Sequence, residues 1–176
     1  MNLAAGLHRR SAILALIPLC LATTRASTDP AQNLAGRYYA QFKDALVTGE
    51  KYIGEDIVEI VPVAPGSAYV RIHLDYYNGH TCGIFGVAQS QAAALVYRDP
   101  TPQYDGGTCT LRLERNGRSL SIDDNGGSCS GYCGARGSLS KVTVPYSSKR
   151  PIRYLARLKA SEEYRDALAE WRKATR

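Results

Sequence analysis

From Gly36 to Val144 the chain repeats one pattern, in which short runs rich in β-branched and aromatic residues alternate with turns rich in Gly, Pro, Asn and Asp. Within several runs apolar and polar residues alternate, which is typical of a strand with one buried face. In one run Val70, Ile72 and Leu74 share a face, and Arg71, His73 and Asp75 share the other. We predict strands over Arg37–Phe42, Ile57–Val63, Ala68–Tyr76, Thr81–Ala88, Ala92–Tyr97, Thr108–Glu114 and Ser119–Ile122.

The turns between these runs indicate how the strands are connected. Asn78-Gly79 and Asn116-Gly117 supply the positive φ angles of tight hairpin turns at low cost. Many short strands joined by hairpins predict a mainly β fold, an antiparallel meander closed into a small β-barrel over residues 36–146. A two-sheet sandwich is the alternative.

The tail of the chain, residues 147–176, changes its period. After Pro151 the apolar residues recur at three- and four-residue steps, at Leu155, Leu158, Tyr164, Leu168 and Trp171. Ser161 is a good N-cap, and two acids follow it in the first turn. We therefore predict an amphipathic helix over Glu162–Lys173, preceded by a shorter one over Ile152–Lys159, with its apolar stripe packed on the barrel.

Residues 1–26 have the features of an export signal. A basic start is followed by the apolar run Ser11–Leu21, and small residues lead to a cleavage site near Ala26. The run is too short for a stable membrane anchor. The sequence thus predicts a periplasmic or secreted protein with a loose N-terminus over residues 27–35.

The charge of the mature chain argues against nucleic acid as a partner. Loss of residues 1–26 leaves 19 of the 22 Lys and Arg side chains, against 16 acidic ones. This mild excess lacks the basic stripe with interleaved aromatics that binds nucleic acid.

Four cysteines remain after processing: Cys82, Cys109, Cys129 and Cys133. An even number in an exported chain predicts two disulfides, for which three pairings exist. We favour Cys82–Cys109, whose residues lie in adjacent predicted strand segments, and Cys129–Cys133. The spacing fits no zinc motif, so no metal is expected.

On that pairing, the stretch from Cys129 to Gly137 is a small disulfide-closed, glycine-rich loop. Such a loop presents side chains in a fixed pose, which suits recognition better than catalysis. Its candidate partner-binding residues are Ser130, Gly131, Tyr132 and Arg136. Arg136 has two interpretations: it either braces the loop carbonyls or pairs with a partner's carboxylate.

No pattern in the chain predicts catalysis. His73 and His80 lie near no nucleophile motif. Glu55-Asp56 and Asp123-Asp124 are each adjacent in sequence, so they do not face each other across a cleft. Asp123-Asp124-Asn125-Gly126 lacks the later acid of a calcium loop and is predicted to be a plain turn. We expect no enzyme, no catalytic residue and no cofactor.

Several segments resemble small exported bacterial β-barrel proteins of the periplasmic lysozyme-inhibitor type. They are Gly36-Arg37-Tyr38-Tyr39, the turn from Asn78 to Cys82, and the loop from Cys129 to Gly137. The resemblance implies a disulfide-bonded barrel that pushes a loop into a lysozyme cleft, against the catalytic acids. Ser130, Gly131, Tyr132 and Arg136 would be the inserted groups.

These features lead to one main hypothesis and two alternatives. The main hypothesis is a periplasmic binding protein, lysozyme-inhibitor-like or of the immunity type, that blocks a lysozyme or another peptidoglycan hydrolase. The alternatives are a small-ligand carrier that uses the barrel interior, and a structural envelope protein.

Overall fold

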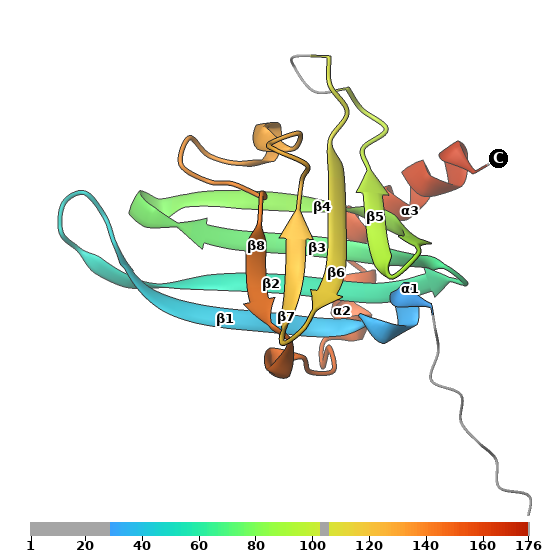
Figure 1. The fold of residues 1–176 in the computed structure, drawn as a ribbon, viewed down its shortest axis with the longest axis horizontal. Coiled ribbons are helices and arrows are strands. Elements are labelled where there is room, and N and C mark those ends of the chain that lie inside the picture. Colours follow the sequence, from blue (N-terminus) through green and yellow to red (C-terminus); the bar gives the residue numbers. More distant parts are fainter. Residues whose placement is uncertain (1–28, 103–105, 176) are drawn as a thin grey trace, which may run out of the picture.

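The computed structural model describes residues 29–102 and 106–175. Eight antiparallel strands form one sheet in which spatial order follows chain order (Figure 1). The strands are β1 (Gly36–Ala45), β2 (Lys51–Ala64), β3 (Ser67–Tyr76), β4 (His80–Gln91), β5 (Ala94–Arg98), β6 (Thr110–Asn116), β7 (Ser119–Asp123) and β8 (Val142–Pro145). The helices are α1 (Pro30–Asn33), α2 (Leu155–Lys159) and α3 (Glu162–Ala174), and single 3-10 turns are η1 (Tyr77–Gly79), η2 (Ser130–Tyr132) and η3 (Tyr146–Ser148).

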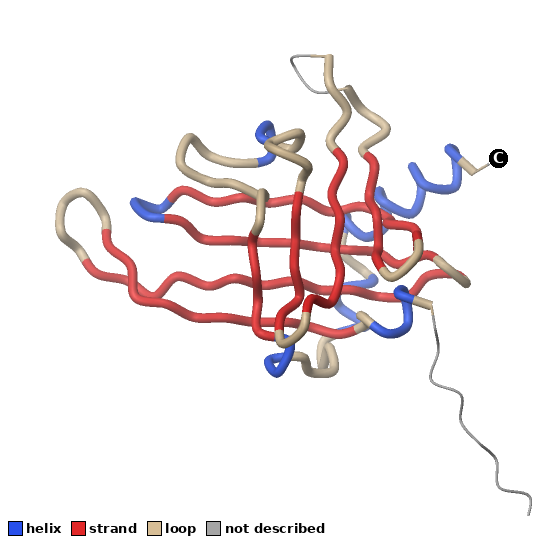
Figure 2. The backbone as a smooth tube through the Cα atoms, in the orientation of Figure 1, coloured by secondary structure: helices blue, strands red, loops and turns tan. Residues whose placement is uncertain are grey.

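The sheet folds over itself into a nearly closed barrel, as the meander pattern predicts. The long strands β1–β4 form one layer, and the shorter β5–β8 cross in front of them (Figures 1 and 2). The change of layer occurs where β4 and β5 pair over only three residues each, ending at Gln89 opposite Val96. On the other side, Arg37 of β1 bridges to Arg150, just after η3.

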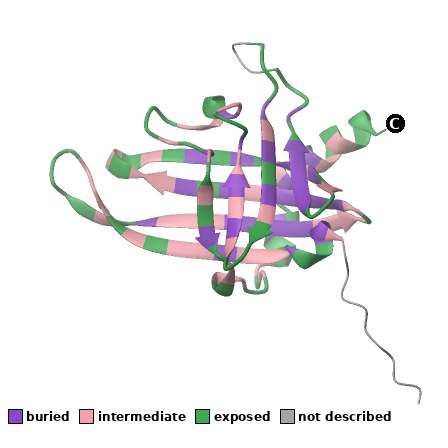
Figure 3. Cartoon of the chain, viewed as in Figure 1, coloured by how far each residue is buried: buried purple, intermediate pink, exposed green. Residues whose placement is uncertain are grey.

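Side chains fill the space between the two layers. On β3, Val70, Ile72 and Leu74 are buried in the core, and the exposed or half-buried Arg71, His73 and Asp75 face outward, which confirms the predicted alternation. The largest interior side chains are less than 2% exposed and come from both layers (Figure 3): Tyr38, Ile60, Ile72, Leu74, Leu95, Leu111, Leu113, Leu120, Ile122 and Leu139.

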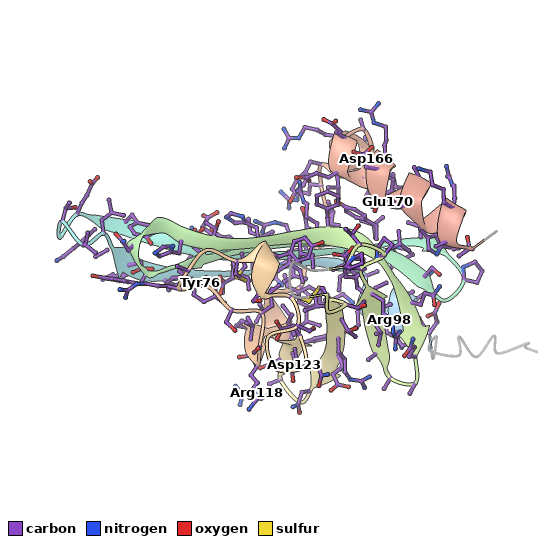
Figure 4. The ribbon with its side chains drawn as sticks, turned by 90° about the horizontal axis from the view of Figure 1, so that it is seen from above. Tyr76, Arg98, Arg118, Asp123, Asp166 and Glu170 are labelled. Atoms are coloured by element: carbon purple, nitrogen blue, oxygen red, sulfur yellow. A yellow bond between two sulfur atoms is a disulfide. The ribbon has the colours of Figure 1, made fainter. Side chains whose placement is uncertain are left out.

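Helices α2 and α3 pack on the outer face of the long-strand layer, opposite the short strands (Figure 4). The Ser161 side chain caps α3 by accepting the Tyr164 N–H at 3.3 Å, so the predicted helix is confirmed within one residue. The ring of Tyr164 stacks edge-on against Tyr69, with 4.8 Å between centroids. Together with Val61, Leu158 and Ala167 these residues form a second apolar cluster outside the barrel.

The N-terminal segment differs from the prediction of a loose stretch over residues 27–35. From Asp29 onward it is ordered, and Ala31 and Leu34 of the α1 segment are buried in the main core. The Asp29 carboxylate accepts hydrogen bonds from the N–H groups of Ala31 and Gly66 and from the Ser90 hydroxyl. Gly66 and Ser90 are far from Asp29 in the sequence, and their hydrogen bonds hold this segment in place. A local sequence pattern does not reveal such partners, so the prediction missed the ordered segment. The predicted signal, residues 1–26, lies outside the described residues.

Two glycines of β4 test this packing. A Cβ on Gly86 would lie 2.1 Å from the Tyr97 ring, whereas a Cβ on Gly83 would meet nothing within 4 Å. We expect Gly86→Ala to lower the free energy of unfolding by about 1–3 kcal/mol, because it overpacks the core. The matched Gly83→Ala should change it by less than about 1 kcal/mol. Urea unfolding followed by circular dichroism measures both, and equal effects would contradict this account of the core.

Candidate functional site

The segment from Asp124 to Lys141, between β7 and β8, carries the candidate site, and we call it the braced loop. Two disulfides join it to the barrel, Cys82–Cys133 and Cys109–Cys129. The predicted number of disulfides is confirmed, but the predicted pairing, Cys82–Cys109 with Cys129–Cys133, is wrong. Cys82 lies on β4 and Cys109 precedes β6, and β5 separates these two strands in the sheet.

The braced loop is therefore not closed on itself. Turn η2 separates Cys129 from Cys133, and each of them reaches a different layer of the barrel. The disulfides span 51 and 20 residues of sequence. Cross-links of this length stabilise a fold by about 3–4 kcal/mol each in the chain-entropy account.

Asp124 organises the start of the braced loop. It is 1% exposed, and its carboxylate accepts the N–H groups of Gly127 at 3.0 Å and Cys129 at 3.1 Å, and the Ser140 hydroxyl. The carboxylate thus holds a turn together. Within the described ranges, no three His, Cys, Asp or Glu side chains gather as metal ligands.

The second half of the braced loop closes one end of the barrel. Leu139 is fully buried in the main core, and the Tyr76 hydroxyl donates to the Ser138 carbonyl. Gly137 is required here, because a Cβ would lie 2.7 Å from the Cys82 sulfur. Helix α1 lies at the opposite end of the long strands (Figure 1).

The four predicted partner-binding residues fall into two groups. Ser130, Gly131 and Arg136 are exposed, as is much of the braced loop (Figure 3). Tyr132 is half-buried against the main core, and its hydroxyl donates to the buried Asp99. Tyr132 thus helps to hold the loop.

Arg136 has an aromatic neighbour that sequence reasoning missed. Its guanidinium carbon lies 5.9 Å from the ring centroid of Tyr77, a residue of the β3–β4 turn that is 46% exposed. The Asn78-Gly79 signal located this turn, but no local pattern showed that the braced loop lies beside it.

The tip of the β1–β2 hairpin adds apolar surface at this end of the molecule. Val47 is 68% exposed and Ile53 is 54% exposed. The Val47 N–H donates to the Asn78 side chain, which ties the hairpin tip to the β3–β4 turn. We call Val47, Ile53 and Tyr77 the hairpin patch. A shallow hollow beside Ile53 and Tyr77 is also lined by Lys43 and Lys51.

The two histidines lie on neighbouring strands and contact different groups. The His73 imidazole lies 3.1 Å from the Asp75 carboxylate on the outer face of β3. His80 lies against the braced loop, with its Nδ1 3.0 Å from where a Cβ of Gly134 would stand. Burial raises the pKa of the partly buried Asp56, and the charge of the neighbouring Asp75 acts in the same direction.

Comparison with protein-family models, with curated proteins and with solved structures finds no match to this chain. Over the described residues, none of the helices has the length and apolar character needed to span a membrane. The disulfides are consistent with an oxidising compartment outside the cytosol.

The disulfide pairing is directly testable by peptide mapping without reductant. Trypsin cuts after Arg98, between Cys82 and Cys109, and chymotrypsin cuts after Tyr132, between Cys129 and Cys133. We expect one linked peptide pair that contains Cys82 and Cys133 and another that contains Cys109 and Cys129. Mass spectrometry reads both pairs, and a peptide with Cys129 linked to Cys133 would refute this topology.

Proposed function

We propose that this chain is an exported binding protein that blocks a lysozyme or another peptidoglycan hydrolase, as an inhibitor or immunity-type protein of the periplasm. The observation that carries the proposal is the position of Arg136. It is exposed on a loop that two disulfides join to different layers of the barrel, and it lies beside the exposed ring of Tyr77. The loop does not have to be ordered on binding, which lowers the entropic cost of association.

The chemistry of this surface favours an acidic cleft as the target. A guanidinium pairs with a carboxylate through two parallel hydrogen bonds. Glycosidases carry two carboxyl groups on either side of the scissile bond. The hairpin patch, whose Tyr77 lies beside Arg136, supplies apolar area, and at its edge the two lysines Lys43 and Lys51 outnumber the acid Asp44.

Within this proposal the residues of the braced loop have separate roles. Arg136 is the anchor, Ser130 and Gly131 contribute exposed contact surface, and Tyr132 supports the loop through Asp99. Tyr77 joins the contact surface. The carrier alternative is disfavoured, because large side chains fill the interior of the barrel.

An inhibition assay with the exported, disulfide-bonded protein tests the proposal against several lysozyme types. We expect Arg136→Ala to raise the inhibition constant on the order of 10- to 100-fold, because it removes a desolvated charge pair. Arg118→Ala removes an exposed arginine at the far end of the short strands and should leave inhibition unchanged (Figure 4).

Two outcomes count against the proposal. If the wild type inhibits none of the enzymes, blocking of a muramidase is wrong. If Arg136→Ala inhibits as strongly as Arg118→Ala, the activity stands but the braced loop is not its site.

A further inference from the structure

The outer face of the long-strand layer is only partly covered. Helices α2 and α3 pack over one end of it, and no other helix of residues 29–102 and 106–175 lies on this face (Figure 4). Strand register places Arg71 opposite Phe85, and His73 opposite Gly83, on this face of β3 and β4. An open groove of about 370 Å³ runs along these pairs up to α3 and Tyr154. Its volume is within the roughly 300–1,000 Å³ of small-molecule sites.

The floor of the groove has the shape of a shallow slot. Gly83 has no side chain, and nothing lies within 4 Å of where its Cβ would stand. Phe85, two residues along the same strand and 38% exposed, borders this gap on one side. Ile57 of β2 also lines the groove. A glycine gap beside an exposed aromatic ring leaves room for a flat ligand to lie on the sheet and contact that ring.

At the end of the groove next to α3, charged and polar side chains form a hydrogen-bonded network. Glu59 is fully buried and accepts a hydrogen bond from Arg71 Nε at 2.6 Å, and Nη2 of the same guanidinium lies 2.6 Å from the same carboxylate oxygen as an ion pair. The Tyr154 hydroxyl donates to the other oxygen of Glu59. Nη1 of Arg71 reaches Glu163 of α3 at 3.1 Å. This network holds the half-exposed groups of Arg71 and Glu163 at the groove in one arrangement.

The ionisable groups along the groove already have partners within it. Arg71 is paired with two carboxylates, and His73 lies against Asp75. A ligand carboxylate or phosphate would have to displace Glu59 or Glu163 to pair with Arg71, and that would leave a carboxylate of the network without its partner. A neutral ligand that both donates and accepts hydrogen bonds can still use these groups, because the groove offers guanidinium donors, carboxylate acceptors and an imidazole.

We propose that this groove binds a neutral saccharide, with one sugar ring lying over Gly83 against Phe85 and its hydroxyl groups hydrogen-bonded to His73, Arg71 and Glu163. A pyranose ring has a face of C–H groups that packs on an aromatic ring and an equator of hydroxyls that act as donors and acceptors. That pattern matches an apolar slot with fixed polar groups at its end. This site lies apart from the braced loop, and its assignment does not depend on the proposed function.

Titration of the ¹⁵N-labelled, exported protein with two neutral probes tests the inference: the tetrasaccharide of N-acetylglucosamine, and maltotetraose. We expect at least one of them to shift the amide signals of His73, Gly83 and Phe85, with a Kd on the order of 1 mM or below. If neither sugar shifts these signals at millimolar concentration, or if the shifts map elsewhere, the proposal is wrong.

Variants make the test specific. Gly83→Val fills the slot with a side chain. The protein should stay folded, because nothing lies within 4 Å of the new Cβ and because valine is favoured in strands. We expect this variant to lose the shifts of the amide signals. Phe85→Ala should weaken binding about tenfold, and Phe85→Tyr should restore it. Arg136→Ala should bind the sugar like the wild type. Undiminished binding by a folded Gly83→Val variant would overturn the assignment.

Discussion

Cys129 and Cys133 form their disulfides with residues in different layers of the barrel, and the rest of the structure depends on this arrangement. The β4–β5 ladder, where the sheet passes from one layer to the other, is only three residue pairs long. The disulfides to Cys82 on β4 and to Cys109 before β6 join the layers at a distance from that ladder, because Cys82 lies near the start of β4 and the ladder lies at its end. They also fix the loop whose Leu139 closes the end of the core.

The buried acids share one role in this molecule. Glu59 and Asp124 are fully or almost fully buried, and each accepts hydrogen bonds from several protein groups. An unpartnered buried carboxylate would cost several kcal/mol, so such partners are required for folding. These acids order the Arg71 network and the braced loop. The groups that we propose for recognition, Arg136 on the loop and the Phe85–Gly83 slot on the outer face, are exposed.

The two proposed surfaces arise from different physical constraints. The braced loop is rigid because covalent bonds and the Asp124 turn hold it from below, which leaves its outer side chains accessible. The groove exists because α3 covers only one end of the long-strand layer, and because Gly83 leaves a gap between the side chains on the uncovered part. The Glu59–Arg71–Glu163 network lies at the boundary between the covered and the open part.

The sequence by itself determined the alternation on β3, the Asn-Gly turns, the capped helix after Ser161 and the number of disulfides, because each depends on residues close together in the chain or on composition alone. The disulfide partners, the order of the segment around α1, and the placement of Arg136 beside Tyr77 were decided only by tertiary structure. Cys82 and Cys109 are neighbours among the cysteines along the chain, yet β5 lies between their strands in the sheet. Which residues meet across the barrel depends on where the meander changes layer, and that bend leaves no local signal in the sequence.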